Sequence, residues 1–311
     1  MIVCVSLNPA LDRCIWLPAL MPHRVNRATA AEASPGGKAA NVALAARALG
    51  ASVCYIALLG GPTGQAIEHG LCARGIALQA VPTRAASRVN LELIDEQGVT
   101  EVLEPGATPA PEELTELVAR CAGVFRTCAP GSVVAISGSL PPGVEPSVYA
   151  ELIQLAKGLG LRVILDTSGA WLEGGLLAKP HFVKPNREEA EVLLRLQIRS
   201  PADAKAAALE LVRRGAEAAI VSLGSAGLVG SDGARVRLVV PPVIEARSAV
   251  ACGDAAVAGL AVALERGDAR PAQLAFAAAC GAANCLAESP GSLDPAVVES
   301  LRNRCVVSFV D

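Results

Sequence analysis

The sequence has few aromatic residues, few histidines and no long apolar run. Aromatic residues make up 3% of the 311 positions, whereas 52% of positions are hydrophobic and alanine is abundant. This composition predicts a densely packed α/β interior, large enough for one large domain or two ordinary ones. The three histidines, His23, His69 and His181, lie far apart and form no recognisable metal motif. The longest apolar stretches, such as residues 274–283, are too short to cross a bilayer.

The sequence also lacks a large excess of positive or negative charge. The formal net charge is −3, so we expect neither nucleic acid nor an anionic membrane as a partner, and any phosphate site must be a local cluster of Lys and Arg. The ten cysteines are scattered through apolar runs without Cys-x-x-Cys spacing, which predicts buried thiols in a reducing cytosol. No basic leader precedes the strand-like residues 1–5, so we expect a cytoplasmic protein.

What the sequence does contain is organised around residues 248–259, where small turn-forming residues lead into an Asp and then an alanine-rich run. The run predicts a buried helix with Asp254 at its N-terminus. The first amides of a helix lack intrahelical partners and the dipole is positive there, so the amides of Ala251, Cys252 and Gly253 are candidates to hold an anion. Asp254 is then either a plain helix cap or a general base beside an anion hole.

Two N-terminal turns carry polar groups where elements meet. The apolar strand at residues 2–7 runs into a Pro-containing turn that holds Asn8 and Asp12. Ligands of open α/β sheets sit beyond strand ends, so these two residues are candidates to contact a ligand, with an Asx turn as the alternative. A glycine pair ending at Gly37 precedes an expected helix. Lys38 lies in the first turn of that helix, where the positive end of the helix dipole disfavours a positive side chain. Its placement there suggests a role in function and not in stability.

A second group of segments is prone to form β-structure. Residues 14–34 lack helical periodicity, and residues 89–95 and 99–103 alternate as a hairpin does. Arg88 and Asn90 are one two-residue step apart and therefore share a strand face. An Arg fork and an Asn amide suit a phosphate, whereas an exposed Arg on a strand is the plain alternative.

The second half of the chain alternates regularly between strands and helices. Each of four short apolar strands ends in a polar loop rich in Gly or Pro. The strands are expected at residues 132–136, 162–165, 182–183 and 218–221. Such regularity predicts a parallel sheet flanked by helices, with the four loops on one edge.

In their order and over nearly the whole chain, these motifs resemble those of the ribokinase-like (PfkB-type) carbohydrate kinases. The catalytic signature of that family, Gly-(Ala/Ser)-Gly-Asp, is similar to residues 251–254, with Ala251 in place of the first glycine. That alanine is strained if the position needs a positive φ. Residues 36–41 resemble Gly-Gly-Lys-Gly-x-Asn, with Ala39 in place of the third glycine, and residues 8–12 and 88–90 resemble the hexose-phosphate branch.

The resemblance implies one ribokinase-like domain over residues 1–311, a three-layer α/β/α fold with a mainly parallel sheet. A small β-sheet lid is expected from segments at about 12–34 and 87–106. The implied reaction uses ATP and Mg²⁺ to phosphorylate a phosphorylated hexose, with fructose 1-phosphate to fructose 1,6-bisphosphate favoured and tagatose 6-phosphate and fructose 6-phosphate left open. A non-catalytic sensor of a sugar phosphate or nucleotide is the further alternative. Lids of the family often pair, so a homodimer through the lid is expected.

The resemblance also implies roles for single residues. Asp254 takes the proton from the acceptor hydroxyl, and the amides of Ala251, Cys252 and Gly253 hold the transferred phosphoryl group. The expected substrate-binding residues are Asn8, Asp12, Gly37, Lys38, Asn41, Arg88, Asn90 and Ser139, of which Lys38, Arg88 and Ser139 hold the phosphate already on the sugar. The expected nucleotide-binding residues are Lys184, Asn186, Ser222, Gly224, Gly227 and Asn284, and Glu189 is expected to bind Mg²⁺ through water.

Cys252 stands where the family has Ala or Ser. The positive potential of a helix N-terminus favours thiolate, so we expect Cys252 to be the most reactive of the ten cysteines if solvent reaches it. Burial in apolar surroundings has the opposite effect.

Overall fold

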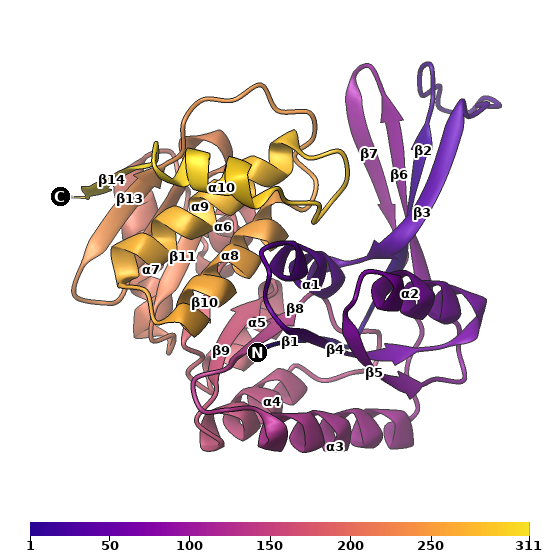
Figure 1. Cartoon of the computed structure of the whole chain (residues 1–311), viewed down its shortest axis with the longest axis horizontal. Coiled ribbons are helices and arrows are strands. Elements are labelled where there is room, and N and C mark those ends of the chain that lie inside the picture. Colours follow the sequence, from indigo (N-terminus) through magenta and orange to yellow (C-terminus); the bar gives the residue numbers. More distant parts are fainter. Residues whose placement is uncertain (311) are drawn as a thin grey trace.

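The computed structural model describes residues 1–310, which form three layers and a projecting small sheet (Figure 1). The middle layer is a ten-stranded sheet of order β14-β13-β12-β11-β10-β9-β8-β1-β4-β5. The strands from β11 to β5 in this order run parallel, and β12, β13 and β14 are antiparallel. Their bounds are β1 Ile2–Ser6, β4 Val53–Leu59, β5 Ala77–Pro82, β8 Val133–Ser137, β9 Arg162–Asp166, β10 Phe182–Val183, β11 Ala219–Ser222, β12 Leu228–Ser231, β13 Val236–Val240 and β14 Val306–Phe309.

Helices cover both faces of this sheet, so its central strands are apolar on both sides. In β1, Ile2 and Cys4 belong to one core and Val3 and Val5 to the other. The first core is covered by α1 (Lys38–Ala48), α2 (Gly61–Ala73), α8 (Cys252–Arg266), α9 (Arg270–Leu286) and α10 (Pro295–Arg302). The second core is covered by α3 (Pro111–Thr127), α4 (Ser147–Gly158), α5 (Gly169–Leu176), α6 (Arg187–Leu194) and α7 (Pro201–Arg213).

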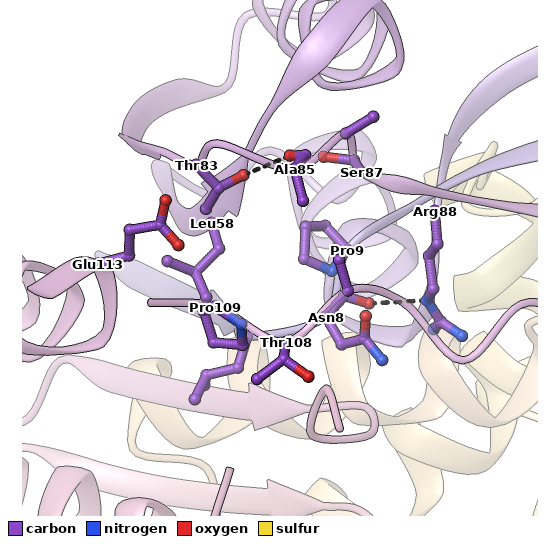
Figure 2. Close-up of a pocket in the computed structure, with 13 residues that line it drawn as sticks. Asn8, Pro9, Leu58, Thr83, Ala85, Ser87, Arg88, Thr108, Pro109 and Glu113 are labelled. Carbon is purple, nitrogen blue, oxygen red and sulfur yellow. Dashed lines mark hydrogen bonds between the residues drawn. The ribbon is translucent and has the colours of Figure 1, made fainter. Parts of the chain in front are cut away.

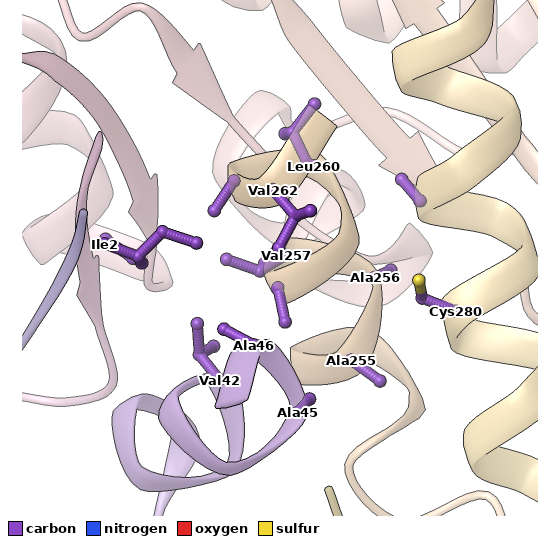
Figure 3. Close-up of a cluster of buried hydrophobic side chains, with 14 of the residues drawn as sticks. Ile2, Val42, Ala45, Ala46, Ala255, Ala256, Val257, Leu260, Val262 and Cys280 are labelled. Atoms are coloured by element: carbon purple, nitrogen blue, oxygen red, sulfur yellow. The ribbon is translucent and has the colours of Figure 1, made fainter. Parts of the chain in front are cut away.

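Small residues allow α8 to pack tightly between α1 and α9. Figure 3 shows Val42 and Ala46 of α1 facing α8, with Cys280 of α9 on its other side. A Cβ atom added at Gly259 would lie 2.6 Å from the Cys280 sulfur, so the two helices touch there through backbone. This packing fixes the N-terminus of α8, and with it Asp254, relative to α1.

The small sheet stands apart from the main layers, above α1 and α2 in Figure 1. Its order is β3-β2-β6-β7, with bounds β2 Ala10–Trp16, β3 Ala30–Gly36, β6 Arg88–Asp95 and β7 Gly98–Leu103. Asp12 pairs with Asn90, so one face carries both polar side chains. The next residues along the strands point the other way, which gives the opposite face Leu91 and Leu93.

The structure confirms the expected fold class, the parallel strands and the lid hairpin. The observed lid strands span residues 10–36 and 88–103, close to the expected segments. The antiparallel β12 and β13 and the helix α3 were not anticipated. Within residues 1–310, no helix combines the length and apolar character that a bilayer crossing requires.

Candidate active site

Asp254 is the third residue of α8 and is 8% exposed. The residue that caps the helix, Ala251, has φ 57° and ψ 9°, the left-handed conformation. The position therefore does need a positive φ. Ala251 is strained there, as the sequence analysis expected for this case. The Asn41 amide of α1 donates a hydrogen bond to Asp254 Oδ2 at 2.9 Å, which fixes one carboxylate oxygen.

The pKa of Asp254 is set by opposing neighbours. Burial raises it, Lys38 lowers it, Asp166 raises it, and Asn41 and Lys184 lower it, with a resulting value of about 6. The carboxyl is thus ionised at neutral pH yet is more basic than an ordinary Asp. A general base works best with a pKa near the working pH.

Two lysines and two further carboxylates lie around the Asp254 carboxyl group. Lys38 Nζ lies 3.1 Å from Glu189 Oε1 and 3.8 Å from Asp166 Oδ1. Lys184 Nζ lies 3.2 Å from Asp166 Oδ1, and a Cβ atom added at Gly253 would be 3.3 Å from that nitrogen. Lys184 therefore reaches the N-terminus of α8, where backbone amides already favour negative charge.

The pKa of Lys38 is raised. Burial alone would lower it, but the carboxylates of Asp166, Glu189 and Asp254 together outweigh that effect. Lys38 thus stays charged at the centre of the cluster. It contacts these carboxylates and not the groups around Arg88, so its position favours the transferred phosphoryl group over the phosphate already on the sugar.

Asp166, at the end of β9, is a residue that our sequence analysis did not single out. It is fully buried, and neither carboxylate oxygen accepts a hydrogen bond within the described residues, although Lys184 and Lys38 lie nearby. A buried carboxylate with free lone pairs fits a water-mediated cation. The sequence did offer a signal, because Asp166 lies where one of the four short strands meets its polar loop.

The expected nucleotide residues gather where β10 and β11 end. Asn186 caps α6 and exchanges hydrogen bonds with Glu189, because Asn186 Oδ1 accepts from the Glu189 amide at 2.8 Å and Glu189 Oε2 accepts from the Asn186 amide at 2.9 Å. This is a capping box, which the Asn-x-x-Glu spacing could have predicted. Asn186 also forms a bridge with Ser222, and Gly224 follows with open space around it.

Gly227 ends the turn of this loop. A Cβ atom there would lie 2.0 Å from the Val239 carbonyl oxygen, and φ is 92°, so only glycine fits. The structure therefore brings Lys184, Asn186, Ser222, Gly224 and Gly227 to one edge of the sheet.

Asp12 links the lid to this edge. Its Oδ2 accepts from the Gly37 amide at 3.1 Å, and its Oδ1 accepts from Asn90 Nδ2 at 2.8 Å. Asn90 is 6% exposed, yet its Oδ1 has no partner among the described residues. A buried acceptor without a partner is costly and is satisfied when a ligand supplies a donor such as a hydroxyl.

Asn8, Arg88 and Ser139 form a second polar group. Asn8 Nδ2 donates to Ser139 Oγ at 3.1 Å and to the Pro105 carbonyl at 3.0 Å, and Arg88 Nε donates to the Asn8 carbonyl at 3.2 Å. Asn8 and Arg88 also line a hollow of about 30 Å³ (Figure 2), which has room for water and not for a hexose phosphate. Much of the Asn8 side chain is thus used to brace loops.

Comparison with known proteins identifies the family of this chain. Residues 5–296 match the family described as pfkB family carbohydrate kinase. The chain is 36% identical to 1-phosphofructokinase of Rhodobacter capsulatus over 90% of each chain. It is 32% identical to ATP-dependent 6-phosphofructokinase isozyme 2 of Escherichia coli over 92% of each chain. It is 31% identical to tagatose-6-phosphate kinase of Staphylococcus epidermidis over 94% of this chain and 95% of that protein.

The fold agrees with these matches. The tetrameric inhibited form of phosphofructokinase-2 from Escherichia coli superposes with a TM-score of 0.89 at 30% identity, over 97% of this chain and 98% of that one. This chain belongs to the pfkB family of carbohydrate kinases. The expected family is confirmed, and membership implies phosphoryl transfer from ATP to a carbohydrate.

In this pfkB-family kinase, two expected roles differ from the observed contacts. Asn284 is 3% exposed and its amide is used internally, since Nδ2 donates to the Val250 carbonyl at 2.8 Å and Oδ1 accepts from the Gly291 amide at 2.9 Å. It braces the loop before α8, so its contacts favour a structural role, and nucleotide binding by Asn284 stays a prediction. The pKa of Cys252 is raised, chiefly by the neighbouring Cys285 and by burial. This direction argues against Cys252 as the most reactive thiol, which was expected only if solvent reaches it.

Proposed function

We propose that this kinase transfers the γ-phosphoryl group of ATP to a hexose that already carries a phosphate, with fructose 1-phosphate as the favoured acceptor. The observation that carries the proposal is the buried Asp254, held by Asn41 at the N-terminus of α8 beside Lys38 and Lys184. The arrangement suits an acceptor hydroxyl and a multiply charged leaving group.

In the reaction, Asp254 accepts the proton of the acceptor hydroxyl. The hydroxyl oxygen bonds to the γ-phosphorus while the bond from that phosphorus to the ADP oxygen breaks. Amides at the start of α8, including that of Gly253, and the ammonium groups of Lys38 and Lys184 stabilise the negative charge on the transferred group. Positioning and charge stabilisation account for most of the catalysis in such a transfer.

The carboxylates around these lysines fit a divalent cation held mainly by water and phosphate oxygens. Residues 1–310 hold no group of three or more His, Cys, Asp or Glu that could enclose a metal. Mg²⁺ typically uses one or two carboxylates together with substrate phosphates. Asp166, whose Oδ2 has no hydrogen-bond or ion-pair partner among the described residues, and Glu189 would hold it here. When bound, Mg²⁺ neutralises charge on the nucleotide phosphates.

The acceptor lies, in this proposal, between the lid and the edge of the sheet. Asn90 Oδ1 is free to accept a hydrogen bond from a sugar hydroxyl, and Asp12 holds Asn90 in place. Arg88 and Ser139 hold the existing phosphate. Relatives named tagatose-6-phosphate kinase and 6-phosphofructokinase keep tagatose 6-phosphate and fructose 6-phosphate as rival acceptors.

We further propose that the lid belongs to the same domain as the main layers and pairs with the lid of a second copy. The lid face opposite Asp12 and Asn90 carries a mostly apolar row, interrupted by Arg13 and Thr100. The apolar members of this row are Ile15, Ala31, Ala33, Leu91, Leu93 and Val102. Val102 is 49% exposed, and a second lid would cover it.

An ADP-release assay over fructose 1-phosphate, fructose 6-phosphate, tagatose 6-phosphate and unphosphorylated fructose tests the proposal. We expect turnover with all three phosphates to exceed that with fructose, and the highest kcat/KM with fructose 1-phosphate. Equal turnover of fructose and its phosphates contradicts the assignment of Arg88 and Ser139. Absence of ADP release with every sugar, from protein that binds ATP, favours the sensor alternative.

A further inference from the structure

Two cysteines meet at the N-terminus of the catalytic helix. Cys252 is the first residue of α8, and Cys285 lies near the end of α9. Ser248 connects them, because its carbonyl accepts from Cys252 Sγ at 3.7 Å and its amide donates to the Cys285 carbonyl at 3.4 Å. The surroundings place both sulfurs in the same small space. The amide of Asn284 lies 3.6 Å from Cys252 Sγ, and a Cβ atom added at Gly281, whose carbonyl accepts from Cys285 Sγ at 3.4 Å, would be 3.1 Å from the Cys252 carbonyl oxygen.

The backbone ties these two residues to one loop. The carbonyl of Cys285 accepts from the Arg247 amide at 2.8 Å, and Cys252 Sγ lies 3.7 Å from the Ser248 carbonyl. Both cysteines are free and partly exposed, whereas Cys4, Cys54, Cys121 and Cys280 are buried. A small solute can therefore reach this pair more readily than it can reach the core thiols.

The two thiols are chemically unequal. The interaction between the two side chains lowers the pKa of Cys285 and raises that of Cys252. Cys285 is thus the nucleophile, and Cys252 is the neighbour that supplies a proton and a second sulfur. A thiol of lowered pKa beside a second cysteine is the arrangement found in redox-sensing proteins.

We propose that Cys252 and Cys285 form a reversible disulfide when the protein meets a peroxide, and that this bond switches the kinase off. The thiolate of Cys285 attacks a peroxide oxygen, the O–O bond breaks, and hydroxide leaves. Cys285 is then a sulfenic acid. The sulfur of Cys252 attacks the sulfenic sulfur, the S–O bond breaks, and water leaves with the Cys252 proton. Two thiols are oxidised to one disulfide, and one hydrogen peroxide is reduced to two waters.

The loss of activity follows from where Cys252 lies. Sulfur atoms in a disulfide are about 2 Å apart, much closer than two hydrogen-bonded sulfurs, so the bond draws the first turn of α8 towards α9. The amides of Ala251, Cys252 and Gly253 move with that turn. Donors in such an anion hole act only when they point at the developing charge. This consequence rests on the proposed function, whereas disulfide formation does not.

The test uses the full-length, reduced protein treated with hydrogen peroxide at low protein concentration. We expect the mass to fall by about 2 Da and a peptide pair linked through Cys252 and Cys285 to appear after digestion. We also expect ADP release with the preferred sugar phosphate to fall about 10²-fold, and dithiothreitol to restore both mass and activity. Because the mass readout needs no turnover, it still tests the disulfide if the proposed function is wrong.

Two variants serve as controls. Cys285→Ser should retain activity before treatment and resist peroxide, because no second sulfur is available. Cys72→Ser, at an exposed cysteine on α2, should lose activity as the parent protein does. The proposal is overturned if treated parent protein yields no Cys252–Cys285 peptide, or if Cys285→Ser is inactivated as fast as the parent protein.

Discussion

At the scale of single residues, the proton affinity of Asp254 links structure to activity. Burial and Asp166 favour the protonated form, and Lys38, Asn41 and Lys184 favour the ionised form. The folded-state pKa is raised to about 6, so the group loses its negative charge as pH falls through that value. A base that is protonated cannot accept the hydroxyl proton.

The first prediction concerns the pH profile. We expect kcat/KM for the sugar phosphate to be level above pH 7 and to fall about tenfold per pH unit below pH 6, as the free enzyme's base is protonated. Initial rates in a set of overlapping buffers measure this. A level profile down to about pH 5 would mean that a group of ordinary carboxyl pKa serves as the base.

The second prediction concerns Arg88. Arg88→Ala should raise KM for the sugar phosphate about 10- to 100-fold and KM for ATP little, because one hydrogen bond to a charged group contributes about 1.5 to 3 kcal/mol. Arg84→Ala removes an exposed Arg from the same segment and should change neither constant. Equal increases in both KM values would show that Arg88 acts by bracing Asn8 and Glu104, whose carbonyls it already contacts.

The third prediction concerns the strain at Ala251. Ala251→Gly should increase the free energy of unfolding by up to about 1 kcal/mol, because glycine adopts a positive φ without the penalty that alanine bears. Arg195→Gly relieves a similar φ of 54° at an exposed helix end and should stabilise comparably. Turnover should rise or stay level in the first variant and stay level in the second. A large loss of turnover in Ala251→Gly would mean that the alanine itself is required.

At the scale of elements, the sequence was informative where a pattern is local. Strand ends, the lid hairpin and the start of α8 follow from alternation and helix signals, and the structure has them. The spacing of Asn186 and Glu189 could also have predicted the capping box of α6. The sequence analysis instead assigned Asn186 to nucleotide binding and Glu189 to Mg²⁺ binding. Both roles are compatible, since Glu189 Oε1 remains free of the capping bonds and contacts Lys38.

The fourth prediction concerns the lid. Leu91→Asp places a charge in the apolar row on its outer face and should convert a lid-paired dimer into a monomer, because an unpaired charge is costly at an apolar interface. Val243→Asp changes a residue that is 98% exposed elsewhere and should leave the assembly unchanged. Light scattering of the eluting peak measures the mass. A Leu91→Asp protein that keeps the mass of the parent excludes this face as the interface.

At the scale of the whole molecule, the site depends on contacts that no local pattern reveals. Asn41 meets Asp254 across 213 positions of the sequence, and Lys38 meets Glu189 across 151. The motifs indicated which residues matter, while their pairing needed the fold. For this reason the sequence analysis missed Asp166, and the roles expected of Lys38 and Asn284 stay predictions although their contacts favour other roles. Their roles are set by neighbours from other elements, and a composition with net charge −3 conceals the buried Lys184 and the partly buried Lys38.

The most direct test of the account is the turnover of Asp254→Asn. An amide has nearly the same shape but cannot accept the proton, so kcat should fall by about 10² to 10⁴ while both KM values stay within a few-fold. The variant should unfold at no lower temperature than the parent, since a neutral side chain avoids burying a charge. Such a result supports Asp254 as the base. A folded Asp254→Asn protein with kcat within about tenfold of the parent contradicts the central claim.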